Sequence, residues 1–291
     1  MEGLEASAVP LTGGYQGQTF AVTAGGEAAV LKLYVKDPDR AVVDAALLQL
    51  ARGLLPVPRV LDLKREGSLE DPPYLLMERL PGVNLQVYLE TAGPDERRKV
   101  GTQLGELLAR LSGMPFLTAG LFRGGELTVE PFGNADLEEY ADGLGFKPDG
   151  LLEVFAAAED LLDGAGNRFC LVHSDFNPKN LLVDPGTARI TGLIDWEFSF
   201  AGSPYADLGN LLRFETDPVL AGAVLSALRG SGLELAEPLV ELGRAADLWA
   251  LLDLASRADQ NPVAAAAAVL AARMADTRTL SGGRPDLDVV H

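Results

Sequence analysis

Residues 173–180 carry the most informative combination of chemical groups in this sequence. They read His-Ser-Asp-Phe-Asn-Pro-Lys-Asn and lie between an apolar run and a predicted strand. A carboxylate at Asp175 can orient a hydroxyl group and accept its proton, and an amide oxygen at Asn180 can help to hold Mg²⁺. Asp and Asn are also common in turns, where they bond their own backbone. Alone, this segment leaves two interpretations open, a catalytic loop and an ordinary turn.

A second acidic group ends a predicted strand fifteen residues after Asn180. The run Ile-Thr-Gly-Leu-Ile-Asp-Trp-Glu at residues 190–197 places Asp195 at the end of that strand. A hairpin of strands 181–183 and 188–194 brings Asp195 opposite Asn180, and oxygen ligands of these kinds suit Mg²⁺. The alternative is a solvated strand end, which the combination of two motifs at matched spacing disfavours.

A third group lies near the N-terminus. Gly13, Gly14 and Gly17 form a cluster just before a strand, where backbone amides can approach a phosphate. Lys32 lies on a following predicted strand and points away from its immediate apolar neighbours, so it can meet phosphate charge. Glycine clusters are usually turns, and strand lysines are usually solvated. A dinucleotide-binding loop and a P-loop are both disfavoured, because the cluster opens a strand rather than a helix and lacks Gly-Lys-Ser/Thr.

These groups require elements to position them, and the sequence predicts a strand-rich first part. Four strands are expected, at residues 19–23, 28–34, 59–63 and 74–78. Between the second and third strands, apolar side chains at helical spacing predict a helix that ends near Arg52. Helical periodicity dominates the remainder, at residues 85–90, 94–112, 151–162, 234–259 and 262–279. A non-helical island at residues 169–212 carries the hairpin. The predicted fold class is therefore α+β, with a division at Pro81 and Gly82.

Composition excludes several classes of function. The 291 residues include 24 Lys and Arg against 42 Asp and Glu, for a net charge of −18. This disfavours binding to duplex nucleic acid or to an anionic membrane. Residues 1–80 carry 8 basic and 11 acidic residues, and residues 81–291 carry 16 basic and 31 acidic residues, so most of the acidic excess lies in the second part.

One cysteine and two histidines exclude an intrachain disulfide and disfavour a zinc site. Because no signal peptide or membrane helix is recognised, we expect a cytoplasmic protein.

On these motifs the chain resembles the aminoglycoside phosphotransferase and choline kinase-like enzymes. The resemblance is carried by residues 173–180, by Ile-Asp-Trp-Glu at 194–197 and by Asp-Leu-Gly at 207–209. It extends from residue 11 to about residue 212. It implies a bilobal protein-kinase-like fold, with a small antiparallel-sheet N-lobe containing one helix (residues 1–80) and a larger, mainly helical C-lobe (residues 81–291).

The resemblance also implies roles for individual residues. Asp175 becomes the catalytic base, Asn180 and Asp195 hold Mg²⁺, and Lys32 contacts the phosphates of ATP or GTP. The glycine cluster would cover the phosphates, and the backbone at Glu78 and Leu80 would bind the base. Asp207 would brace the catalytic loop, while His173 and Trp196 would pack structurally. The family places Glu on the first helix to pair with the strand lysine, and the chain instead has Asp44, which is one methylene shorter.

The acceptor is less defined by the sequence. The resemblance implies a small molecule with a hydroxyl group, and the acidic second part favours a cationic one such as an aminoglycoside. Choline would suit Trp249 beside acids. The acids considered for the acceptor are Asp136, Glu138, Glu139, Asp142, Glu159, Asp160, Asp163, Glu241, Asp247 and Asp253. A solvated helix face is the alternative for most of them.

Two other functions stay open: a metabolic kinase for choline, homoserine or a sugar, and a non-catalytic nucleotide-binding protein. The protein is expected to be a monomer or a homodimer.

Overall fold

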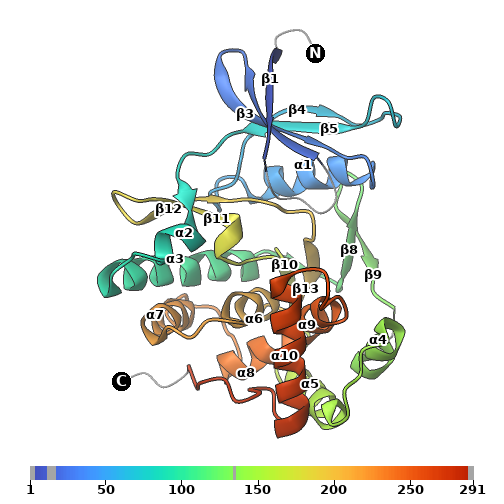
Figure 1. The fold of residues 1–291 in the computed structure, drawn as a ribbon, viewed down its shortest axis with the longest axis vertical. Helices are drawn as coiled ribbons and strands as arrows, with labels where there is room; N and C mark the ends of the chain where they lie inside the picture. Colours follow the sequence, from blue (N-terminus) through green and yellow to red (C-terminus); the bar gives the residue numbers. More distant parts are fainter. Residues whose placement is uncertain (1–3, 12–17, 134–135, 288–291) are drawn as a thin grey trace. The chain divides into compact units, whose positions relative to one another are not determined.

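The computed structural model describes residues 4–11, 18–133 and 136–287 (Figure 1). The chain divides by its internal contacts into two compact units. Unit 1 comprises Met1–Ala92, Gly120–Glu130 and Pro178–Phe200, and unit 2 comprises Gly93–Ala119, Pro131–Asn177 and Ala201–His291. The contacts thus group the hairpin of residues 178–200 with the N-terminal part. The division into lobes at residues 80 and 81 stays a prediction.

Unit 1 is built on an antiparallel sheet with the order β1-β2-β3-β5-β4. Its strands are β1 (Leu4–Pro10), β2 (Gln18–Ala24), β3 (Glu27–Leu33), β4 (Val60–Lys64) and β5 (Tyr74–Glu78). Strands β2 and β3 pair without a register shift and are joined at Gly25 and Gly26. Both glycines have positive φ, 58° and 84°, as the tight turn of a two-residue hairpin requires. The strands predicted at residues 19–23 and 28–34 are thereby confirmed as β2 and β3.

Helix α1 (Arg40–Ala51) connects β3 to β4 and contacts β4 and β5, as Figure 1 shows. Leu31 and Ala29 lie on one face of β3 and pack in a small apolar cluster with Val22 and Leu76. Because side chains alternate along a strand, Lys32 points to the opposite face. That is the face that α1 covers, and Lys32 is consequently buried, with 5% of its surface exposed.

A second sheet in unit 1 carries the hairpin predicted from the sequence. Its order is β12-β11-β6, and its strands are β6 (Val83–Asn84), β11 (Leu181–Asp184) and β12 (Arg189–Leu193). Asp184 turns the hairpin by accepting the N–H groups of Gly186 and Thr187. The short helix α2 (Leu85–Leu89) and the 3₁₀ turn η1 (Pro178–Asn180) contact each other beside this sheet. Strands β8 (Gly120–Arg123) and β9 (Thr128–Pro131) are neighbours in a further hairpin.

Unit 2 is mainly helical. Its helices are α3 (Pro94–Ser112), α4 (Leu137–Leu144), α5 (Leu151–Gly164), α6 (Ala206–Leu212), α7 (Pro218–Arg229), α8 (Leu239–Ala246), α9 (Leu248–Ala255) and α10 (Pro262–Thr277). Strand β10 (Phe169–Val172) pairs with β7 (Pro115–Phe116), and β13 (Phe200–Gly202) crosses the boundary between the units in the chain. Side chains of α4, α5, α9 and α10 share one apolar core.

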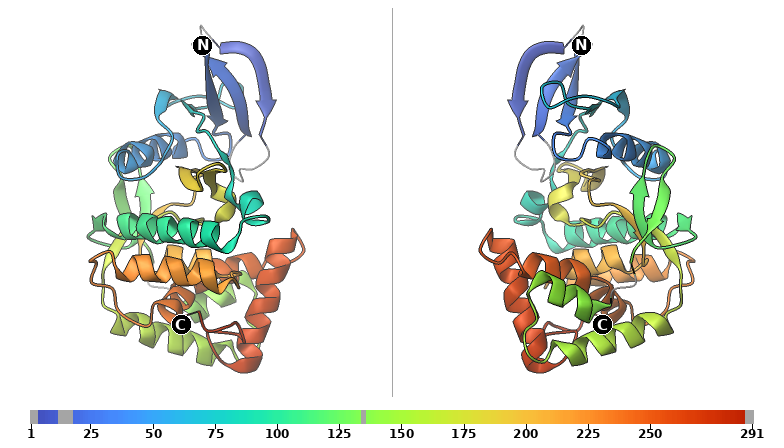
Figure 2. Two further views of the ribbon diagram at one scale, coloured as in Figure 1. Left: turned by 90° about the vertical axis from the view of Figure 1, so that its left-hand side faces the viewer. Right: turned by 90° about the vertical axis from the view of Figure 1, so that its right-hand side faces the viewer.

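Helices α3 and α7 lie side by side, which both views of Figure 2 show. Glycines on α3 allow this close approach. A Cβ on Gly101 would lie 2.6 Å from the carbonyl oxygen of Leu220, and Gly105 meets the carbonyl of Val224 in the same way. Gly209 of α6 similarly faces the backbone of Gly243 on α8. Small residues therefore set the helix spacing beneath strand β10, which itself contacts α3.

Several element predictions differ from the structure. The single helix predicted at residues 234–259 is in fact two helices, α8 and α9, which are separated at Asp247. The break was missed because the apolar pattern continues through it. The island predicted as non-helical contains α6, whose residues are buried on all sides except at its first position, so it has no amphipathic stripe. Helices α4 and α7 were not predicted. No helix in the described residues has the length and apolarity needed to cross a membrane.

Candidate functional site

Lys32 lies among the charged groups of unit 1. Its Nζ is 2.9 Å from Oε2 of Glu197, 3.3 Å from Oδ1 of Asp195 and 3.5 Å from Oδ2 of Asp44. Burial opposes the charged form of the lysine, but the three carboxylates outweigh burial and raise its pKa. The ammonium is therefore charged at neutral pH. The structure brings together three of the residues singled out in the sequence, Lys32, Asp44 and Asp195.

Glu197 is the residue of this cluster to which the sequence analysis gave no role. Its carboxylate is 1% exposed and is the closest of the three to Lys32. The signal was present, because Glu197 is the third residue of the Asp-Trp-Glu run. Asp44 is the shorter substitute for the expected glutamate, and its carboxylate is shared among several donors. The hydroxyl of Tyr34 donates to Asp44 at 2.6 Å, and burial together with Asp44 raises the pKa of Tyr34 well above its usual value.

The hairpin places Asn180 and Asp195 next to each other along paired backbone. Leu181 pairs with Leu193, and the N–H of Ile194 donates to the carbonyl of Asn180 at 2.9 Å. Asn180 is 8% exposed, whereas the Asp195 side chain is 26% exposed. Asp195 has a φ of +64°, a left-handed conformation uncommon for a residue with a side chain. Strain of this kind is typical of functional positions.

The donor chemistry of this cluster fits Mg²⁺. Asp195, Glu197 and Asn180 supply carboxylate and amide oxygens, which hard cations prefer. Asp44, Asp195 and Glu197 lie around Lys32, and even with the guanidinium of Arg40 on Asp44 the cluster keeps one formal negative charge in excess. Among the described residues, no group of three or more His, Cys, Asp or Glu side chains converges as a ready-made metal cage. Mg²⁺ needs no such cage, because it commonly binds one or two carboxylates, waters and substrate phosphates.

The segment that carries Asp175 lies in unit 2 as far as Asn177, and the chain then enters unit 1. The amide of Asn177 donates to Oδ1 of Asp175 at 2.5 Å, so it holds the orientation of that carboxylate. His173 is fully buried, and its Nδ1 accepts the N–H of Asp175 at 3.3 Å. This confirms the structural role predicted for His173. Asn177 was not singled out from the sequence, although it lies within the motif.

Asp207 braces the loop from helix α6. Its two carboxylate oxygens accept the backbone N–H groups of His173 and Ser174, each at 2.8 Å. The predicted bracing by Asp207 is therefore confirmed. Burial raises the pKa of Asp207 to about 7, although the two N–H groups act in the opposite direction, and Asp175 and Asp247 add to the rise. Ser174 has a φ of +71°, so the braced backbone is itself in an uncommon conformation.

A buried ion pair lies near Asp207. Nε and Nη2 of Arg213 donate to the two oxygens of Asp247 at 2.7 and 2.6 Å, a two-pronged geometry that suits a guanidinium. Asp175 is one of the carboxylates whose charge raises the pKa of Arg213, after the larger effects of burial, which lowers it, and of Asp247. The electrostatics of this loop thus involve two acids beyond Asp175 and one arginine.

The predicted base-binding and phosphate-binding segments are only partly described. Glu78 ends β5, and its N–H donates to the carbonyl of Arg59 at 2.9 Å. Leu80 follows the strand, next to Pro81, whose carbonyl accepts the hydroxyl of Thr191. The backbone roles of Glu78 and Leu80 stay predictions. Gly13, Gly14 and Gly17 lie outside the described residues.

A comparison with known families decides the classification. Residues 7–242 match the phosphotransferase enzyme family. The matched range contains every sequence motif described above, and the helices after residue 242 lie outside it. The chain belongs to the phosphotransferase enzyme family. This confirms the family resemblance and the enzyme class predicted from the sequence.

Two curated relatives are similar to parts of this chain. Acyl-CoA dehydrogenase family member 10 of Mus musculus is 27% identical over 177 residues, which are 55% of this chain and 15% of that protein. Aminoglycoside 3'-phosphotransferase of Streptomyces ribosidificus is 32% identical over 172 residues, 56% of this chain and 61% of that protein. The chain therefore matches less than two thirds of the length of either relative.

A solved structure supports the fold assignment for this phosphotransferase family member. It is a thermostable mutant of aminoglycoside phosphotransferase APH(4)-Ia in a ternary complex with ADP and hygromycin B. The TM-score is 0.66 at 21% identity, and the match covers 97% of this chain and 95% of that chain. At this identity the likeness establishes the fold, and it confirms the predicted protein-kinase-like fold class.

Most of the acids considered for an acceptor already have partners within unit 2. Lys147 pairs with Glu138 at 2.6 Å and with Asp142 at 3.2 Å. Two further acids accept backbone N–H groups: Asp136 caps α4, and Glu159 accepts the N–H of Leu137. Three others form ion pairs with arginines: Glu241 with Arg244, Asp247 with Arg213, and Asp253 with Arg257. Trp249 packs on Tyr140 with ring centroids 4.9 Å apart. In this phosphotransferase family member, seven of the ten acids considered for an acceptor therefore already have a partner within unit 2.

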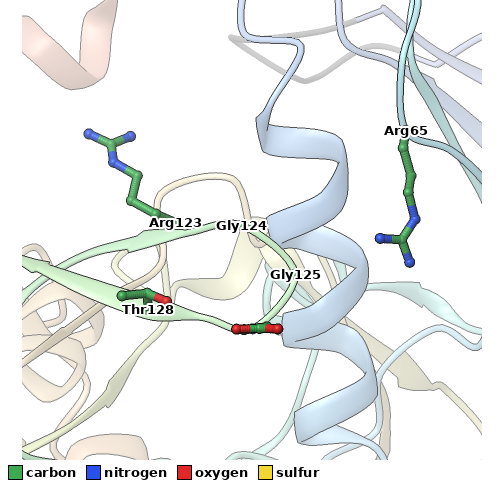
Figure 3. Close-up of a pocket in the computed structure, with 6 residues that line it drawn as sticks. Arg65, Arg123, Gly124, Gly125 and Thr128 are labelled. Carbon is green, nitrogen blue, oxygen red and sulfur yellow. The ribbon is translucent and has the colours of Figure 1, made fainter.

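A surface hollow of about 480 Å³ lies in unit 1 at the turn between β8 and β9. Its lining is Arg65, Arg123, Gly124, Gly125, Glu126 and Thr128, of which Figure 3 labels all but Glu126. Arg123 is already paired with Glu130 at 2.5 Å. None of the residues singled out in the sequence lines this hollow, so it has no part in the proposed phosphoryl-transfer chemistry.

Proposed function

We propose that this protein is a small-molecule kinase that transfers the γ-phosphoryl group of ATP to a hydroxyl group of its acceptor, with Mg²⁺ as cofactor. The observation that carries the proposal is the buried cluster in which Asp195 and Glu197 meet Lys32, together with the oriented carboxylate of Asp175. Phosphoryl transfer depends on positioning and on neutralising charge, and these residue types supply both. GTP is the alternative donor.

Lys32 is proposed to contact the nucleotide phosphates, exchanging part of its present carboxylate contacts for phosphate oxygens. Asp195 and Asn180 would hold Mg²⁺, which supplies charge neutralisation at the phosphates when bound. Backbone groups at Glu78 and Leu80 would bind the base, and Gly13, Gly14 and Gly17 would cover the phosphates. ADP in the related APH(4)-Ia complex supports nucleotide binding. The nucleotide is thus assigned to residues 1–80 with the hairpin, and the acceptor to the helical part.

Asp175 is proposed to accept the proton of the acceptor hydroxyl as that oxygen attacks the γ-phosphorus. Asn177 donates to one carboxylate oxygen of Asp175 and so helps to fix the orientation of the proposed base. Asp207 keeps the loop backbone in place through two N–H groups. Asp175 and Asn180 are five residues apart in the chain, so one short segment carries both the base and a metal ligand.

An aminoglycoside or similar amine-bearing molecule is the first candidate acceptor. The aminoglycoside 3'-phosphotransferase relative and the acidic second part of the chain support it. A metabolic hydroxyl acceptor, such as choline, homoserine or a sugar, is the second candidate. It is favoured by the internal pairing of most acids on α4 and α9.

A coupled assay of ADP release tests the proposal. The full chain is supplied with ATP and Mg²⁺ and with a panel of aminoglycosides, choline, homoserine and sugars, and kcat/KM is compared across the panel. Acceptor-dependent ADP release, lost in Asp175→Asn, supports a kinase and identifies the acceptor class. ATP binding without turnover for any member of the panel would instead support a non-catalytic nucleotide-binding protein. Repeating the assay with GTP decides the donor.

A further inference from the structure

Arg40 is the first residue of helix α1, and its guanidinium makes two short hydrogen bonds within unit 1. Nε donates to Oδ1 of Asp44, one turn along the helix, at 2.6 Å. Nη2 donates to the backbone carbonyl of Trp196 at 2.6 Å, 156 residues away in the chain. The Arg40 side chain is 11% exposed. Both bonds are charge-assisted and largely shielded from water, which strengthens them.

We propose that Arg40 is a positioning residue for the metal-binding segment of residues 195–197. By holding the carbonyl of Trp196, it fixes the carboxylates on either side, those of Asp195 and Glu197, in register with Lys32. This inference rests on the proposed function, which gives the segment its part in binding Mg²⁺ and phosphate.

The backbone of this segment needs such support. Asp195 has a φ of +64°, and a residue with a side chain keeps that conformation only where its surroundings fix it. Within the segment, the indole N–H of Trp196 donates to the carbonyl of Leu193 at 3.2 Å, which anchors the ring to β12. The bond from Arg40 adds an anchor on helix α1. The segment is thereby tied both to its own hairpin and to the helix that covers Lys32.

Arg40 also accounts for the unexpected aspartate on the helix. Asp44 accepts hydrogen bonds from Arg40 and from Tyr34, each at 2.6 Å, whereas Lys32 lies 3.5 Å away. The charge of Asp44 is thus balanced mainly by Arg40. Lys32 is left with Glu197 at 2.9 Å as its closest carboxylate. The lysine therefore depends on the 195–197 segment, and the position of that segment depends on Arg40.

Binding of ADP with and without Mg²⁺ tests this inference. Isothermal titration calorimetry on the full chain gives Kd for ADP in EDTA and in saturating Mg²⁺, and the ratio of the two measures the benefit from the metal. In Arg40→Met we expect this ratio to fall about tenfold, the size typical of losing a residue that orients metal ligands. The Kd in EDTA should change by a smaller factor than the Kd in Mg²⁺, because Lys32 keeps Asp44 as a carboxylate partner on helix α1.

A second variant and a control keep the test decisive. Arg40→Lys keeps the charge but replaces the planar fork by a single ammonium, so the ratio should fall in this variant as well. It decides the outcome if Arg40→Met does not fold, as judged by its circular dichroism melt. Arg52→Met, at the exposed end of the same helix, should leave the ratio unchanged. An unchanged ratio in a folded Arg40 variant overturns the inference while the kinase proposal stands. Failure of the wild-type chain to bind either ADP or GDP, with or without Mg²⁺, overturns both.

Discussion

The carboxylate of Glu197 lies 2.9 Å from the ammonium of Lys32, closer than the carboxylate of Asp44 at 3.5 Å. The lysine on strand β3 is thus held mainly from the segment that follows β12 rather than from helix α1. Both partners are almost fully buried, with exposed side-chain fractions of 7% and 1%. An ion pair buried to this degree is costly to break from one side, because the remaining charge loses its compensation.

Replacing Glu197 by glutamine tests this pairing. The substitution keeps the shape but removes the nearest negative charge from Lys32, which retains Asp44 and Asp195. We expect the free energy of unfolding to fall by about 1–3 kcal/mol. Urea denaturation at pH 7 measures the change. The control is Glu27→Gln, which breaks an exposed pair with Arg59 at 3.8 Å and should have no measurable effect. Equal stability of Glu197→Gln and wild type would show that the other two acids suffice.

Replacing Asp175 by asparagine separates chemistry from nucleotide binding. The variant loses the proposed base, so acceptor-dependent turnover should fall about 10²–10⁴-fold. The Kd for the nucleotide should stay close to that of wild type, because Lys32 and Asp195 are unchanged. Coupled ADP release and calorimetry measure the two effects. Asp276→Asn, on the exposed face of α10, is the matched control and should retain full activity. A turnover close to wild type in Asp175→Asn would remove Asp175 from the mechanism.

Asn177 should contribute to turnover through Asp175. Its amide holds one oxygen of that carboxylate at 2.5 Å, so Asn177→Ala keeps the base but removes this hydrogen bond. We expect kcat to fall about tenfold, a smaller loss than removing the base itself, with nucleotide affinity unchanged. In the double variant with Asp175→Asn, the Asn177 substitution should add little further loss, because the group it orients is gone. Fully additive losses would contradict this coupling.

Features that depend only on neighbouring residues in the chain were predicted well from the sequence. Strands β2 and β3 and the bounds of α3 were expected and are found. The position of Lys32 on a strand face also followed from alternation. Long-range partners were harder to predict. The link from Arg40 to the carbonyl of Trp196 spans 156 residues and uses a backbone acceptor, which no side-chain pattern reveals.

The misjudged elements have a common physical cause. Periodicity detects a helix through one apolar stripe, and α6 is buried on nearly every side, so its pattern has no stripe. Helices α8 and α9 meet at Asp247, and the local apolar pattern does not reveal this break or the distant partner of Asp247, Arg213. Acids such as Glu138 looked available for an acceptor in the sequence, but their arginine or lysine partners become evident only in three dimensions.

Two glycines on neighbouring helices should respond oppositely to alanine. A Cβ on Gly101 of α3 would lie 2.6 Å from the carbonyl of Leu220, so Gly101→Ala should force α3 and α7 apart and lower the free energy of unfolding by about 1–3 kcal/mol. Gly222, inside α7, has no atom within 4 Å of its Cβ position. Gly222→Ala should therefore raise stability by about 0.5–1 kcal/mol through helix propensity. Urea denaturation compares the two, and a stabilising Gly101→Ala would contradict the close packing.

Asp207 should make stability depend on pH in a particular direction. Burial raises its pKa from 3.8 to about 7, so the folded protein binds this proton more tightly than the unfolded chain does. The contribution is fully present below pH 3.8 and is lost as pH rises toward 7. The stability of wild type relative to Asp207→Asn, which does not titrate, should therefore decline between pH 5 and pH 7, by an amount on the order of a few kcal/mol. Urea denaturation of wild type and Asp207→Asn at several pH values measures it. A wild-type advantage that grows with pH would show that the N–H groups of His173 and Ser174 keep the Asp207 carboxylate ionised.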